Sequence, residues 1–137
     1  MSRALVLDSE ALSALAQPRG QRFVEVRAAL EAARRLRRDV VVPAVVLAEL
    51  YRGPKLNQTV DACLSRETGL EVRDTDREFA RLVGSVVAAA KADSGVLVDA
   101  HCVAAAVETG GGVVITGDPR DLERLAAPYP HVHVAPI

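Results

Sequence analysis

The sequence predicts an α/β fold in which helices cover both faces of a central, mostly parallel sheet. Three short apolar runs, at residues 4–7, 40–42 and 113–115, show no alternation of polar and apolar positions. Such runs are typical of strands buried on both faces, as in parallel sheets. Segments with helical periodicity separate them, which is the pattern of a three-layer α/β/α domain. The chain has 137 residues, so we expect one compact domain over 1–137.

Two further strands are expected at residues 70–73 and 131–134, the first more exposed than the others and the second at an edge of the sheet. The spacing of apolar residues predicts helices over 9–16, 21–38, 44–52, 55–66, 96–109 and 119–126. One more helix should follow Asp74 or Thr75, either of which can cap it. Ser94 is expected to cap the helix that follows it.

Composition excludes several classes of protein. A net charge of −1 and an aromatic content of 3% argue against a membrane-surface protein and against a module that stacks bases on aromatic side chains. Cys63 and Cys102 lack metal-ligand spacing, so we expect two free thiols in a reducing cytosol. The sequence has no leader pattern and no apolar run long enough to span a bilayer, which predicts a cytoplasmic protein with no membrane partner.

Two carboxylates come directly after predicted buried strands. Asp8 follows the strand at 4–7, and Asp118 follows the strand at 113–115 after Thr116 and Gly117. In open α/β sheets, ligands bind at the edge where the carboxyl ends of the strands meet. Each residue also has a structural interpretation, because Asp8 and Asp118 both occupy places where a helix N-cap is expected. Neither residue alone indicates catalysis.

Glu49 and Asp99 are harder to explain structurally, because each lies in a predicted helix that is apolar on nearly every side. Burying an unpaired charge costs several kcal/mol. Arg52, three residues after Glu49, is one available partner for that carboxylate.

Together, these four carboxylates indicate a metal site. Like charges that come close repel one another unless a cation lies between them. Ligands that are all oxygen favour a hard divalent ion, Mg²⁺ or Mn²⁺, and such an ion can activate a water for attack on a phosphodiester. Asp121 is either a further ligand or a carboxylate that stabilises the N-terminus of the last helix. Thr116 could orient Asp8 or Asp118.

Four segments resemble the acidic motifs of PIN-domain ribonucleases, in the same order and at similar spacing. These segments are residues 5–9, 48–53, 98–106 and 114–122. The length and order are similar to those of the small bacterial members, the VapC toxins of type II toxin–antitoxin pairs. The resemblance covers essentially the whole chain, although each motif alone is weak.

The resemblance implies a Mg²⁺- or Mn²⁺-dependent endoribonuclease that acts on RNA, is often dimeric, and is held inactive by a small cognate antitoxin. Asp8, Glu49, Asp99 and Asp118 carry over as its acidic pocket. Two departures stand out: Val98 occupies a place where the family often has Arg, and the last motif has Asp at 118 and again at 121. The fourth ligand therefore stays open between Asp118 and Asp121.

Other polar residues have competing interpretations. His101 is expected to be structural, and His131 and His133 to form a surface pair on an edge strand. Arg73, Arg77 and Arg81 recur every four residues, as either a phosphate-binding stripe on one helix or a solvated face. The cluster from Arg34 to Arg38 is explained by the favourable placement of positive charge at a helix C-terminus.

Two rival functions remain. The first is a non-catalytic interaction module with a PIN-like fold, in which the carboxylates are helix caps and ion pairs. The second is a signalling receiver domain, which needs adjacent acidic residues after the first strand and a lysine after a late strand. Asp8 is separated from Glu10 by Ser9, and no lysine follows Ile115, so the receiver is disfavoured.

Overall fold

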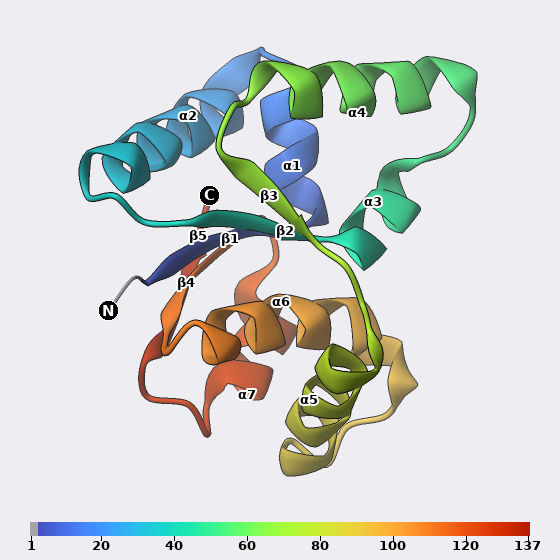
Figure 1. Ribbon diagram of the computed structural model, residues 1–137, viewed down its shortest axis with the longest axis vertical. Helices are drawn as coiled ribbons and strands as arrows, with labels where there is room; N and C mark the ends of the chain where they lie inside the picture. Colours follow the sequence, from blue (N-terminus) through green and yellow to red (C-terminus); the bar gives the residue numbers. More distant parts are fainter. Residues whose placement is uncertain (1–2) are drawn as a thin grey trace.

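The computed structural model describes residues 3–137 and shows a five-stranded sheet with helices on both faces (Figure 1). The strands are β1 (Ala4–Leu7), β2 (Val40–Pro43), β3 (Leu70–Arg73), β4 (Gly112–Thr116) and β5 (Val132–Pro136). They lie in the order β3-β2-β1-β4-β5, and every neighbouring pair is parallel. The predicted fold class is therefore confirmed, as are the exposed character of residues 70–73 and the edge position of the last strand.

Seven α-helices and one 3₁₀ turn connect the strands within the described part of the chain. They are α1 (Ser9–Ala16), α2 (Gly20–Arg35), α3 (Ala44–Leu50), α4 (Pro54–Arg66), α5 (Arg77–Ala89), η1 (Ser94–Val96), α6 (Leu97–Glu108) and α7 (Pro119–Ala126). In Figure 1, α1 to α4 lie on one side of the sheet and α5 to α7 on the other. This arrangement is the expected three-layer α/β/α architecture.

The core is built from small aliphatic side chains. Val6 and Leu7 of β1 and Val42 of β2 are fully buried in the middle of the sheet, which explains why their segments show no polar alternation. Both Cys63 and Cys102 are buried free thiols, as predicted.

Several predicted helix ends and caps are wrong. Asp76, not Asp74 or Thr75, caps α5 by accepting a hydrogen bond from the Phe79 N–H at 2.8 Å. Asp93, not Ser94, accepts from the Gly95 N–H and begins η1, so that α6 starts only at Leu97. Each of these segments offers several capping side chains in a row, and the path of the preceding loop decides which one is used.

Helix α2 ends at Arg35 instead of Arg38, because Arg37 adopts a left-handed conformation with φ 55°. The Arg38 N–H donates to the Ala33 carbonyl at 2.8 Å and the Arg37 N–H to the Arg34 carbonyl at 3.1 Å. This pattern closes a helix in the manner of a Schellman motif, in which the left-handed position is usually glycine. An arginine there carries a backbone penalty that the sequence pattern does not reveal.

Replacing Arg37 with glycine should therefore raise the free energy of unfolding by up to about 1 kcal/mol, because relief of the left-handed strain outweighs the added entropy of the unfolded chain. Urea denaturation measures this change. Arg35→Gly is the matched control, because Arg35 lies within the helix and the same substitution there should destabilise by roughly 0.5–1 kcal/mol. Equal destabilisation by both variants would contradict the strain argument.

Candidate active site

Asp8 is anchored at the carboxyl end of β1. Its side chain is only 6% exposed and accepts a hydrogen bond from the Ala11 N–H at 2.8 Å, so the predicted N-cap role is confirmed. Burial raises the pKa of Asp8, and hydrogen bonds from the Thr116 hydroxyl and the Ala11 N–H partly oppose this rise. The carboxylate is thus held in one orientation by a helix and by the neighbouring strand.

Thr116 joins the ends of β1 and β4. The register of these strands pairs Leu7 with Ile115, so Asp8 and Thr116 follow side by side. The Thr116 hydroxyl is fully buried, bonds Asp8, and accepts a hydrogen bond from the Asp118 N–H at 2.9 Å. The expectation that Thr116 could orient Asp8 is confirmed, whereas its contact with Asp118 is to the backbone N–H.

Asp118 occupies the N-cap position of α7 without acting as a cap. Its side chain makes no capping hydrogen bond to the helix, and the residue is exposed. The predicted N-cap position, with Pro119 at the start of the helix, is therefore confirmed, but the Asp118 side chain does not serve as the cap. The residue follows β4 at the edge of the sheet where the strand order reverses, between β1 and β4, which is the switch point of an open α/β sheet.

Glu49 reaches this edge from α3. Its carboxylate accepts a hydrogen bond from the Ser9 hydroxyl at the start of α1. Arg52 does not pair with it: the Arg52 guanidinium instead donates to the backbone carbonyls of Ala48 and Tyr51, at 2.6 and 2.9 Å. The exposed Glu49 side chain therefore lacks the arginine partner that the sequence suggested.

Asp99, in the first turn of α6, lies at the centre of the acidic residues. Its pKa is raised to about 6, first by burial and then by the charges of Asp8, Asp121, Glu49 and Asp118. The structure thus places the other four predicted carboxylates within electrostatic reach of Asp99. Asp121 and Asp118 both act on Asp99, so the choice between them for the fourth place stays open.

A hard divalent ion fits this donor set by its chemistry. Every candidate ligand is a carboxylate oxygen, and the repulsion that raises the pKa of Asp99 is what a cation would relieve. Over residues 3–137, however, no three histidine, cysteine, aspartate or glutamate side chains are gathered tightly enough to hold an ion as they stand. Glu49, Asp118 and Asp121 are exposed, whereas Asp8 is buried and anchored.

Comparison with known proteins identifies the family. The PIN domain family matches the chain over residues 5–128. The chain belongs to the PIN-domain family. No curated protein matches the sequence significantly.

Several solved structures resemble this PIN domain. One is VapBC2 from Rickettsia felis, which was solved bound to a DNA fragment from the VapBC2 promoter. A chain of that structure is 15% identical, with a TM-score of 0.68 and coverage of 98% of each chain. A toxin–antitoxin complex from Klebsiella pneumoniae is similar at 19% identity and a TM-score of 0.66, covering 97% of this chain and 99% of the other. DNA-bound VapBC from Salmonella typhimurium is similar at 16% identity and a TM-score of 0.64, covering 99% of this chain and 98% of the other. At these identities the likeness shows the fold alone.

His101 is structural in this PIN domain, as predicted. Its ring is buried, with Nδ1 2.7 Å from the Leu97 carbonyl oxygen and an edge contact to Phe79 at 5.8 Å between ring centroids. The neighbouring Cys102, which the sequence analysis did not connect to the site, lies near Asp8 and Asp99. Burial, together with these carboxylates, raises the pKa of the Cys102 thiol well above its ordinary value, so the thiol stays neutral.

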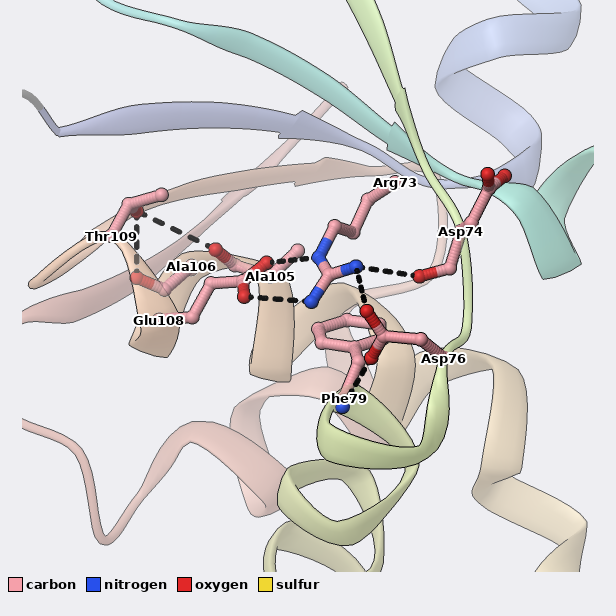
Figure 2. Close-up of polar contacts among 8 residues, drawn as sticks. All are labelled: Arg73, Asp74, Asp76, Phe79, Ala105, Ala106, Glu108 and Thr109. Carbon is pink, nitrogen blue, oxygen red and sulfur yellow. Dashed lines mark hydrogen bonds and ion pairs between the residues drawn. The ribbon is translucent and has the colours of Figure 1, made fainter.

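The proposed arginine stripe at 73, 77 and 81 does not exist as one helix face. Arg73 lies in β3, where its guanidinium pairs with Glu108 at 2.8 Å and Asp76 at 3.4 Å and covers the Phe79 ring at 4.4 Å (Figure 2). Arg73 is therefore a connector between β3, α5 and α6. The four-residue spacing suggested a helix that begins only at Arg77.

Among the helices described in residues 3–137, none combines the length and the hydropathy of a membrane span.

Proposed function

We propose that this PIN domain is a Mg²⁺- or Mn²⁺-dependent endoribonuclease that hydrolyses phosphodiester bonds in RNA. The observation that carries the proposal is the half-buried Asp99, whose pKa is raised to about 6 by burial first and then by the charges of Asp8, Asp121, Glu49 and Asp118. Such clustering of like charge disfavours the metal-free fold, and sites of this kind are typical of function. PIN domains generally use divalent metal ions.

The residues of the site would have different roles in metal binding, because some are fixed in place and others are exposed. Asp8, fixed by the Ala11 N–H and the Thr116 hydroxyl, provides the rigid ligand, and Asp99 provides the central one. Glu49 and either Asp118 or Asp121 would complete the ligand set from exposed positions. When bound, the ion would polarise a water for attack and offset charge on the phosphate.

We further propose that the chain is the toxin of a type II toxin–antitoxin pair, acting as a homodimer in the cytoplasm and held inactive by a small cognate antitoxin. The support is the likeness, over nearly the full length, to chains of VapBC and toxin–antitoxin complexes. Growth should stop when the chain is expressed alone and should resume when the product of a neighbouring small gene is co-expressed. Growth that continues unchanged on expression would contradict the toxin assignment.

The alternative of a non-catalytic interaction module required the acidic residues to be caps and ion pairs. Asp8 does cap a helix, but Asp118 makes no capping bond and Glu49 lacks the Arg52 ion pair. Two of the four carboxylates thus have no structural role of that kind among the contacts described for residues 3–137.

Removing divalent metal should abolish RNA cleavage. The purified protein is expected to cut a mixed RNA pool in Mg²⁺ or Mn²⁺, to lose this activity in EDTA, and to regain it when Mn²⁺ is restored, because the carboxylates cannot approach a phosphate without a cation. Calorimetric titration with Mn²⁺ gives an independent readout, and a saturable heat of specific binding is expected. Cleavage that persists in EDTA, or an absence of Mn²⁺ binding, would contradict the proposal.

A further inference from the structure

A cavity between helices adjoins the acidic site. It has a volume of about 360 Å³ and lies between α1, the start of α2 and the end of α3. Its polar lining consists of Ser9, Glu10, Ser13, Gln17, Arg19 and Arg22. Ser9 is shared with the acidic site, because its hydroxyl donates to Glu49. A molecule bound at the carboxylates could therefore extend directly into this cavity.

Arg22 lies over the backbone that carries Asp118. Its Nη1 is 3.0 Å from Oε2 of Glu10. A Cβ placed on Gly117 would overlap the Glu10 carboxylate and lie 2.9 Å from the guanidinium carbon of Arg22. Because Gly117 separates Thr116 from Asp118, this close approach places the positive charge of Arg22 next to the acidic site.

An RNA phosphate bound next to the acidic site would need a cationic side chain such as Arg22. Five carboxylates repel a polyanion, and a metal ion would compensate only at the bond being cut. Arg19 and Arg22 are the cationic side chains that line the cavity. The Arg22–Glu10 pair is weak, since the two side chains are 51% and 41% exposed. A guanidinium has five donors in a rigid fork, so Arg22 can bind a phosphate without leaving Glu10.

We propose that this cavity is a subsite for the RNA nucleotide next to the bond that is cut, and that Arg22 binds the phosphate of that nucleotide. The Ser13 hydroxyl and the Gln17 amide supply hydrogen-bonding groups for the sugar or base. Gly117 leaves room for Arg22 at the junction of the two sites. The inference rests on the proposed nuclease function and adds to it the place where the RNA strand continues beyond the carboxylates.

The test measures RNA binding separately from cleavage, in full-length protein carrying Asp99→Asn. The probe is a fluorescent, mixed-sequence single-stranded RNA, titrated at several salt concentrations. Adding Arg22→Gln should weaken binding roughly tenfold and reduce the salt slope by about 0.7, the value for one lost phosphate contact on a single strand. Arg22→Lys keeps the charge but loses the fork, so its affinity should be intermediate.

Arg35→Gln is the matched control, because Arg35 is an exposed arginine at the opposite end of the same helix. It should leave affinity and salt slope unchanged. Without the Asp99 substitution, Arg22→Gln should raise KM for RNA and leave kcat within about twofold, since the contact is made equally in the ground and transition states.

Three outcomes would overturn the proposal. Arg22→Gln could bind RNA as Arg35→Gln does, which leaves the nuclease function intact but removes the subsite. Arg22→Gln could bind RNA normally and lose only the cognate antitoxin, which assigns the cavity to a protein partner. The Asp99→Asn protein could fail to bind RNA even at low salt, in which case the cavity does not hold RNA and the subsite is excluded, whereas the nuclease function is decided separately by cleavage with the natural protein.

Discussion

Asp99→Asn should abolish RNA cleavage and at the same time stabilise the metal-free protein. Cleavage is expected to fall by at least about 10²–10³-fold, because the substitution removes the carboxylate that we propose as the central metal ligand. The free energy of unfolding at pH 8 should rise by about 2 kcal/mol. Cleavage assays in Mg²⁺ and urea denaturation in EDTA measure the two effects on the same protein.

The stability gain follows from the raised pKa of Asp99. In the unfolded chain this carboxyl titrates near 3.8, whereas in the folded protein its pKa is about 6. As pH rises from about 4 to 6, the unfolded state loses its proton first, so the free energy of unfolding falls. Above pH 6 the protein has lost all the stability that corresponds to this pKa difference, which is about 3 kcal/mol without screening. Solvent screening of this half-buried group reduces the loss to about 2 kcal/mol.

The stability difference between Asp99→Asn and the natural protein should therefore grow between pH 4 and 6 and stay constant above pH 7. Glu123→Gln is the control, because Glu123 is an exposed carboxylate on α7 and should change neither cleavage nor the pH profile. Loss of cleavage together with a large loss of stability would indicate a structural Asp99 instead. Full cleavage by Asp99→Asn would exclude it from the active site.

The sequence was informative about the fold because the sheet is entirely parallel. A strand such as 4–7 is buried on both faces, and its length of four residues favours a strand over a buried helix. Helix ends were less predictable. Arg37 ends α2 in a conformation that favours glycine, and Asp76 caps α5 in preference to Asp74. Both outcomes depend on how the next segment packs, which local propensity does not encode.

The acidic site could be predicted in outline for a similar reason. Glu49 and Asp99 are conspicuous because their helices are otherwise apolar, and Asp8 because it ends a buried strand. The partners of these residues were not predictable. Ser9 meets Glu49 across 40 positions of the chain, and Arg22 meets Glu10 across 12. Such pairs depend on how α1, α2 and α3 pack together. The periodicity of a single segment carries no information about this packing.

Glu67 is a buried carboxylate that the sequence analysis did not single out. It follows α4, is 3% exposed, and accepts two hydrogen bonds from the Arg27 guanidinium, at 2.6 and 2.9 Å. Arg34 lies at 3.2 Å and Arg66 at 3.5 Å. The hydrogen bonds from Arg27 are the main reason that the pKa of Glu67 is lowered. The cluster joins α2 to the end of α4 on the face of the sheet opposite to α5, α6 and α7.

Glu67→Gln should lower the free energy of unfolding by about 2 kcal/mol at pH 7 without changing RNA cleavage. Breaking a fully buried ion pair costs roughly 3–5 kcal/mol, and the value is smaller here because Arg34 and Arg66 are about half exposed and regain water. Urea denaturation measures the loss. Arg66→Gln, which removes the most distant and half-exposed partner, is the control and should change stability by less than about 0.5 kcal/mol.

The pH dependence gives Glu67 a signature opposite to that of Asp99. The pKa of Glu67 is lower in the folded than in the unfolded protein. Its contribution to the free energy of unfolding is therefore present above about pH 4.5 and is lost as the pH falls through the pKa of the folded state. The stability difference between the natural protein and Glu67→Gln should therefore shrink on acidification. A difference that stays constant down to low pH would show that Glu67→Gln acts through packing and not through the ion cluster.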